Sequence, residues 1–152
     1  MTNKCIDEIR EALDTDKTTS GELFNESRDK AIKYQEEYNS FVTILDKKEE
    51  LDNDSVIRGI PYALKDNIST KGILTTASSN ILKDYIPLYD ATVYRKLKEA
   101  GAVLVGKTVL DELAMGGTNL TAVTGPVRNP YDLNRISGGS SGGSAVLVAS
   151  CL

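Results

Sequence analysis

The sequence predicts an α/β fold in which helices flank a mixed, mostly parallel sheet and further helices form the N-terminal part. Three observations lead to this prediction. Residues 1–56 are polar with apolar residues at helical spacing, residues 57–107 contain two short apolar runs on either side of an amphipathic segment, and no internal repeat is visible. A strand, a helix and a strand in that order predict a parallel βαβ unit, because parallel neighbours need a long crossover connection.

Residues 1–56 are predicted to form an N-terminal helical region. The first helix is indicated by apolar residues at helical spacing, namely Cys5, Ile6, Ile9 and Leu13. A second amphipathic helix is expected over about 20–39, with Ser20 as its N-cap. The segment FVTIL at 41–45 favours a strand, and the charged run DKKEELDND at 46–54 is interpreted as a solvated connector rather than a binding site.

The βαβ unit begins the second region, 57–152. The run Pro61–Leu64 predicts a strand that ends at Lys65, and its lack of alternation is typical of a strand covered on both faces. A helix is then expected from an N-cap at Asp90 to a stop at Gly101. Its apolar face is predicted to carry Val93, Leu97 and Ala100. The run AVLVGK at 102–107 predicts a second buried strand.

The segment Met115–Ser144 has little periodicity, and loops of that length are usually functional or disordered. It ends in GGSSGGS, Gly138–Ser144, which leads into an apolar helix from about Gly143. A phosphate loop would need a lysine that is missing here, and a linker would not lead into an apolar helix. Glycines can instead let the backbone pass close to a substrate, with the hydroxyls of Ser140 and Ser141 before a helix N-terminus that favours negative charge. A plain structural turn stays open as the alternative.

Composition excludes several classes of function. The chain has 152 residues and a net charge of -4, which disfavours a nucleic-acid surface, so any RNA would be held by a partner. It contains no histidine, which excludes Ser-His-Asp and Cys-His catalysis and imidazole metal sites, so a general base must be Lys, Asp, Glu or Tyr. Cys5 and Cys151 lie at opposite ends and are expected to be free thiols. The start shows no signal region and no apolar run reaches about 18 residues, so we expect a cytoplasmic protein without membrane contact.

Lys65 is the candidate base, because it ends a predicted strand at the sheet edge where open α/β folds place their ligands. To accept a proton near pH 7, its pKa must fall far below the usual value of about 10.4, which burial can achieve. A surface lysine with its stem packed on the sheet is the alternative interpretation.

Three motifs, in this order along the chain, resemble the amidase signature family: GIPYALKDNI, DELAMGG and SGGSSGGSA. Members of this family hydrolyse or transfer amide groups with a Ser, cis-Ser, Lys triad. The resemblance covers roughly residues 57–152 well, which it identifies as the first part of that family's domain, and the helical N-terminus loosely. Within the family, KDNISTKGILTTASSNIL and DELAMGGTNL are most similar to the A subunits of amidotransferases that act on misacylated tRNA.

The resemblance implies a role for each matched residue. Lys65 corresponds to the triad lysine, and Ser140 corresponds to the cis-serine that relays the proton, with a cis peptide between Gly139 and Ser140. The loop on the substrate side of the family's site is matched by Met115, Gly116 and Gly117. Ser141 and Ser144 match motif positions as well, and we expect them to cap the following helix.

Two departures from the family pattern matter for function. Ser137 stands where the family usually has proline before the glycines. The acylated serine of the family lies in a second glycine-rich motif of the GGSIR type, shortly after the helix at which these 152 residues end. The resemblance therefore implies an incomplete domain without its nucleophile, which is expected to be inactive by itself.

The resemblance implies a glutamine amidohydrolase subunit that supplies ammonia for the transamidation of misacylated Glu-tRNA(Gln) or Asp-tRNA(Asn). It implies the B and C subunits of the amidotransferase as partners in a heterotrimer, with the tRNA bound through the B subunit. No cofactor is expected in this chain, whereas ATP and Mg²⁺ are expected to be used by the complete complex. The alternatives are a free-standing amidase of small carboxamides and a non-catalytic fragment that binds partner subunits.

Overall fold

The centre of the fold is a three-stranded sheet in the order β1-β3-β2. Its strands are β1 (Phe41–Ile44), β2 (Pro61–Lys65) and β3 (Val103–Thr108). The computed structural model describes residues 5–49 and 55–151, so the last five residues of the predicted connector, 50–54, lie outside the described residues. β2 runs parallel to β3, as the βαβ prediction requires, and β1 pairs antiparallel with β3. The sheet is therefore mixed, which confirms the predicted fold class.

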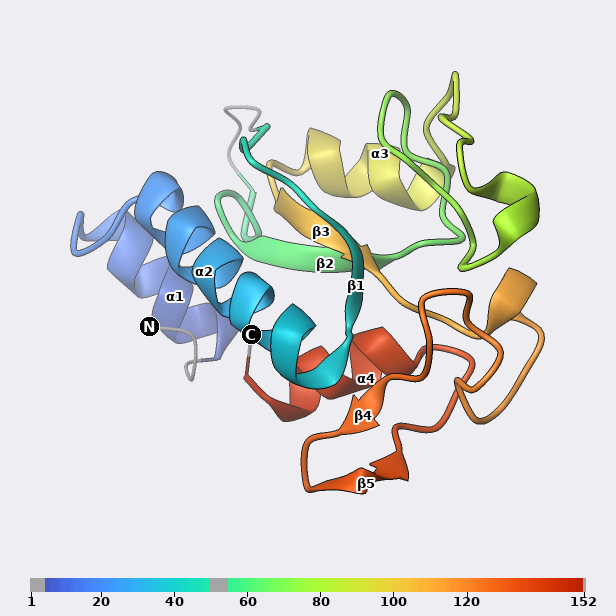
Figure 1. Ribbon diagram of the computed structural model, residues 1–152. Helices are drawn as coiled ribbons and strands as arrows, with labels where there is room; N and C mark the ends of the chain where they lie inside the picture. Colours follow the sequence, from blue (N-terminus) through green and yellow to red (C-terminus); the bar gives the residue numbers. More distant parts are fainter. Residues whose placement is uncertain (1–4, 50–54, 152) are drawn as a thin grey trace.

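Every residue of β3 is buried, because helices cover both faces of the sheet. The helices are α1 (Ile6–Asp14), α2 (Ser20–Tyr38), α3 (Thr92–Glu99) and α4 (Gly142–Ala149). Figure 1 shows α3 on one side of the sheet and α2 and α4 on the other. Leu104 packs against Tyr94 of α3, while Val103 and Val105 pack with Phe24 of α2 and Leu147 of α4. Side chains on the two faces of β3 thus enter two different apolar cores, which explains why apolar and polar residues do not alternate in its sequence.

β2 is less covered than its sequence predicts. Only Leu64 of this strand is buried, and the other four residues are partly exposed. Both faces of β2 nevertheless pack against apolar residues, with Ala63 against one core and Tyr62 and Leu64 in the other, so the partial exposure reflects its place as an edge strand in the described part of the chain.

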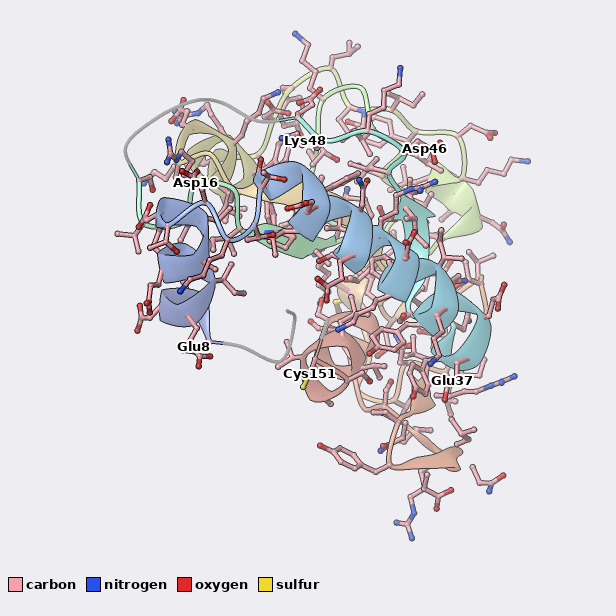
Figure 2. All side chains as sticks on the ribbon, turned by 90° about the vertical axis from the view of Figure 1, so that its left-hand side faces the viewer. Glu8, Asp16, Glu37, Asp46, Lys48 and Cys151 are labelled. Carbon is pink, nitrogen blue, oxygen red and sulfur yellow. The ribbon has the colours of Figure 1, made fainter. Side chains whose placement is uncertain are left out.

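The two N-terminal helices form as predicted, with one difference in capping. The N-cap of α2 is Thr19 rather than Ser20: its Oγ1 accepts from the Glu22 backbone N–H at 3.2 Å, and the Glu22 carboxylate accepts from the Thr19 N–H at 2.9 Å. This is a capping box, which needs a carboxylate or amide three residues after the cap. On α1, Ile9 packs into a small core whereas Ile6 is exposed. Figure 2 looks onto these helices and shows Glu8 projecting from α1.

Helix α3 begins one residue later than predicted. Its N-cap position is Ala91, and the Asp90 carboxylate instead accepts from the Lys71 backbone N–H at 2.6 Å. Val93 is exposed, and Tyr94 takes the buried position that we expected for Val93. Gly101 follows the helix with a φ of 74°, which confirms the predicted stop, since this conformation favours glycine.

The segment 115–144 is more regular than predicted. It contains an antiparallel pair formed by β4 (Arg128–Asn129) and β5 (Asp132–Ile136). The Asn129 side chain accepts from the Tyr131 backbone N–H at 2.9 Å, which closes the turn between the strands. Two 3-10 helices, η1 (Asn80–Leu82) and η2 (Glu112–Ala114), complete the elements of the described residues.

Both cysteines are free, as predicted, and the structure shows that both are exposed. Figure 2 shows Cys151 just beyond α4, on the face of the molecule that α1 and α2 form. Of the helices in residues 5–49 and 55–151, none has the length and apolar character needed to cross a bilayer.

Candidate active site

The side chains of Lys65 and Ser140 meet although the two residues are 75 positions apart in the chain. Lys65 is the last residue of β2, and Ser140 lies just before α4. The Lys65 Nζ is 2.8 Å from the Ser140 Oγ, within hydrogen-bond distance. The peptide between Gly139 and Ser140 is cis, as the family resemblance implies. The chain thus brings a lysine and a hydroxyl together at the carboxyl end of a parallel strand.

Residues 138–144, called the serine loop below, are held against the protein's own backbone. The Ser140 carbonyl accepts from the Asp111 backbone N–H at 2.9 Å, and the Gly143 N–H donates to the Val109 carbonyl at 3.0 Å. A Cβ on Gly143 would overlap the Ser40 carbonyl oxygen. The predicted role of these glycines was to let a substrate approach, but at this position the space is filled by the backbone next to β1 and β3. Close backbone packing, rather than substrate clearance, therefore explains Gly143.

Neither of the other two serines caps α4 through its side chain. Ser141 occupies the N-cap position without a side-chain cap bond, and its φ of -103° and ψ of 44° depart from the extended backbone that a capping side chain needs. The Ser144 Oγ instead lies 2.8 Å from the Thr108 Oγ1. Thr108 is the register partner of Lys65 across β2 and β3. The predicted capping role is therefore wrong, and Ser144 ties α4 to the strand end beside the lysine.

The predicted substrate-side loop lies next to the serine loop. Met115, Gly116 and Gly117 are all exposed, and Met115 is 81% exposed. A Cβ on Gly116 would overlap the carboxyl group of Asp111, and a Cβ on Gly139 would overlap the Asp111 Oδ2 atom. The two loops therefore touch the same buried carboxylate from two sides.

Burial shifts the Lys65 amino group towards its neutral form. Burial lowers the pKa of the Lys65 amino group below its ordinary value, and the negative charge of Asp111 opposes part of this effect. A lowered pKa is what proton acceptance by a lysine requires. The direction agrees with the prediction for a base, which spacing in the sequence could not establish.

A second lysine, Lys107, lies on the neighbouring strand and has a different environment. It is fully buried, and its Nζ donates to the Ile68 carbonyl at 2.9 Å and to the hydroxyls of Thr70 and Thr75 at 2.8 and 2.9 Å. These bonds use all three donors of an ammonium group. The Asp66 Oδ1 lies 3.4 Å from the same nitrogen. Burial lowers the pKa of Lys107 as it does that of Lys65, and the charge of Asp66 and its hydrogen bond oppose this effect. Lys107 therefore fixes the segment after Lys65, and its three bonds to that segment, rather than its pKa, distinguish it from the candidate base.

Replacing Lys107 by methionine is expected to destabilise the chain by about 3–5 kcal/mol, because it leaves the buried Asp66 carboxylate without its cation. The measurement is urea unfolding of the chain followed by circular dichroism. Lys98→Met is the matched control, since Lys98 pairs with Glu49 at the surface, with side chains 35% and 64% exposed, and should cost at most about 1 kcal/mol. Equal midpoints for the two variants would contradict the structural role of Lys107.

The sequence patterns did not predict that three further charged residues belong to this region. Asp66 follows Lys65 directly, Lys107 ends the apolar run AVLVGK, and Asp111 opens the motif DELAMGG. All three are fully buried. A charged residue at the end of an apolar run was the available signal, since such residues are rarely buried unless they are paired or hydrogen-bonded.

A cavity of about 260 Å³ lies beside the site, between α2, β2 and α4. Its lining consists of Ser27, Pro61, Tyr62, Ala63, Val105, Ser144, Leu147 and Val148, and includes neither Lys65 nor Ser140. Among residues 5–49 and 55–151, no group of three or more His, Cys, Asp or Glu side chains is placed to hold a metal ion.

Known proteins are similar in sequence to most of this chain. The model of the amidase family matches residues 22–152. The A subunit of the glutamyl-tRNA(Gln) amidotransferase from Saccharolobus solfataricus is 49% identical over 135 residues, which cover 84% of this chain and 28% of that protein. The corresponding protein from Sulfolobus acidocaldarius is 44% identical over 152 residues, which cover 95% of this chain and 32% of that protein. The chain thus spans less than a third of the length of these curated relatives.

Solved structures are similar over most of the chain. The A subunit of the glutamyl-tRNA(Gln) amidotransferase from Thermotoga maritima superposes with a TM-score of 0.72 at 40% identity, covering 88% of this chain and 32% of that one. A 6-aminohexanoate cyclic dimer hydrolase superposes with a TM-score of 0.88 at 26% identity, covering 99% of this chain and 32% of that one. The arrangement of strands, helices and loops described above is therefore shared with larger proteins of these two kinds.

Proposed function

The chain belongs to the amidase family, and on that premise we propose that it supplies the lysine base and the relay serine of an amide-hydrolysing site in the A subunit of a tRNA-dependent amidotransferase. The observation that carries the proposal is the 2.8 Å contact between the Lys65 Nζ and the Ser140 Oγ. The relatives named as A subunits of glutamyl-tRNA(Gln) amidotransferases support the choice of this branch of the family.

In the proposed reaction, neutral Lys65 accepts a proton from Ser140 as Ser140 takes one from a nucleophilic serine. The nucleophile forms a bond to the amide carbon of glutamine, the C–N bond breaks, and the proton returns through Ser140 to the leaving ammonia. Water then hydrolyses the acyl-enzyme to glutamate and the free serine. We place the nucleophile in a second glycine-rich motif that these 152 residues do not contain, so the chain by itself is proposed to be inactive.

The partners follow from the same proposal. Ammonia passes to the B subunit, which binds the misacylated Glu-tRNA(Gln) or Asp-tRNA(Asn) and uses ATP and Mg²⁺, and the C subunit completes a heterotrimer. The net charge of -4 supports this division of labour, because a chain with this charge is a poor surface for tRNA. A cytoplasmic location accompanies a role in translation.

The test is a chimera in which this chain replaces the matching segment of the A subunit from Thermotoga maritima, purified with its partner subunits. We expect the chimera to release ammonia from glutamine, and the rate to rise when ATP and misacylated tRNA are added. A folded chimera that assembles but releases no ammonia would overturn the catalytic proposal and favour a fragment that only binds partner subunits.

A free-standing amidase of small carboxamides is the second candidate function. It is favoured by the TM-score of 0.88 with the 6-aminohexanoate cyclic dimer hydrolase, which exceeds the 0.72 with the amidotransferase protein. The same chimera separates the two, because a free-standing amidase would cleave small carboxamides at a rate that is indifferent to the partner subunits, to ATP and to misacylated tRNA.

A further inference from the structure

Asp111 is a buried acidic residue to which the proposed mechanism gives no role. It lies three residues after β3, and its side chain is fully buried. Its Oδ2 accepts from the Asn119 backbone N–H at 3.0 Å, and its Oδ1 accepts from the Thr121 hydroxyl at 2.9 Å. Within the described residues it forms no ion pair. A buried carboxylate held only by neutral donors is costly, and such costs are expected mainly at functional sites.

The position of Asp111 connects it to both members of the Lys65–Ser140 pair. Its backbone N–H donates to the Ser140 carbonyl at 2.9 Å. Its carboxylate fills the space beside Gly139 and Gly116, since a Cβ on either glycine would overlap it. The carboxylate therefore lies in close contact with the segment that carries the Ser140 hydroxyl, and we expect that a displaced carboxylate would move that segment.

We propose that Asp111 is a positioning residue for the Lys65–Ser140 pair, which holds the serine loop in place and presents a fixed negative charge to the lysine. This inference rests on the proposed function for its catalytic consequence only. The contacts of Asp111 with Ser140 and Gly139 exist independently of any reaction.

The charge of Asp111 also acts on Lys65. It opposes the effect of burial and keeps the pKa of Lys65 higher than burial alone would leave it. Other charged groups nearby are engaged elsewhere. Lys107 and Asp66 face each other, and the Glu112 carboxylate accepts from the Ser79 hydroxyl at 2.7 Å. Helix α4, which follows Ser140, carries no charged residue.

Asp111→Asn tests the proposal, because the amide has the shape of the carboxylate and lacks its charge. The measurement is competitive labelling of this chain with a limiting amount of acetic anhydride over a series of pH values, with the Lys65 peptide followed by mass spectrometry. We expect the pH midpoint for Lys65 to move to lower pH in the variant. Glu112→Gln is the matched control, since it removes a charge from the next residue, and it should leave the midpoint unchanged.

Turnover in the chimera is the second readout. Asp111→Asn is expected to lower kcat by about tenfold to a hundredfold, because a small misplacement of a catalytic group has an effect of this size. The acid limb of the rate profile should move to lower pH together with the labelling midpoint. A structural role alone would lower kcat without moving either. Labelling needs no turnover, so it tests this inference even if the chimera releases no ammonia.

Gly116→Ala provides a second test of the proposal if Asp111→Asn does not fold. The new methyl group would displace the Asp111 carboxylate while its charge is retained, whereas the methyl group in Gly117→Ala would meet no atom within 4 Å. We expect Gly116→Ala to change the Lys65 midpoint and Gly117→Ala to leave it as in the unmodified chain. The proposal is overturned if Asp111→Asn and Gly116→Ala both label as the unmodified chain does, or if Glu112→Gln gives the same change as Asp111→Asn.

Discussion

Lys65→Ala is expected to reduce glutamine hydrolysis by the chimeric enzyme by about 10²–10⁴-fold, the range that a general base contributes. The variant removes the nitrogen that lies 2.8 Å from the Ser140 Oγ, so the proposed relay has no final proton acceptor. The loss should fall on kcat, because Lys65 is proposed to take part in proton transfer and not to bind glutamine. The measurement is ammonia release at saturating glutamine.

Two further measurements identify Lys65 as a base rather than a packing residue. Small primary amines in the buffer should partly restore turnover of Lys65→Ala, with a pH dependence that follows the added amine. In the unmodified chimera, the acid limb should lie below the ordinary pKa of lysine, because burial lowers the pKa of Lys65 and the neutral form is the active one. Lys71→Ala, an exposed lysine of the same segment, is the control. If the Lys65→Ala variant turned over glutamine within twofold of the unmodified chimera, Lys65 would be excluded as the base.

Ser140→Ala is the second variant with a large expected effect, a loss comparable to that of Lys65→Ala. Its hydroxyl is the group in contact with the Lys65 amino group, so its removal leaves the lysine without a proton path to the nucleophile. Ser141→Ala is the matched control, because the neighbouring side chain makes no cap bond to α4. The outcome that contradicts the relay is an equal loss in both serine variants.

The double variant Lys65→Ala, Ser140→Ala shows whether the two residues act as one unit. Residues that share one proton path are strongly non-additive, so the double variant should be no slower than the slower single variant. A loss equal to the product of the two single losses would mean that Lys65 and Ser140 act separately.

The type and order of the main elements were predictable from local patterns. Apolar spacing predicted α1 and α2, and the runs at 61–64 and 102–107 predicted the two parallel strands that come before and after α3 in the chain. Lys65 was expected at the end of a strand and is there. These predictions succeed because hydrophobic periodicity reports which face of a helix or strand is buried.

Details that depend on neighbours distant in the chain were not predictable. Residue type favours Ser20 and Asp90 as caps, yet Thr19 and Ala91 have the cap positions. The Thr19 cap follows from local spacing, since Thr19 and Glu22 form a capping box, whereas the Asp90 carboxylate is engaged by the Lys71 N–H from outside the helix. The β4–β5 pair was not predicted from the sequence, because its strands are short and exposed and so carry little apolar pattern.

Motif order and residue type in the chain are sufficient to choose the α/β class, the family and the two side chains of the proposed relay, Lys65 and Ser140. The environment of those side chains is decided only by the folded structure. Packing buries Asp111 between two glycine loops and Lys107 among threonines, and it places one charge close enough to act on Lys65. The physical reason is that a pKa depends on burial and on charges nearby in space, and neither quantity is a property of sequence neighbours.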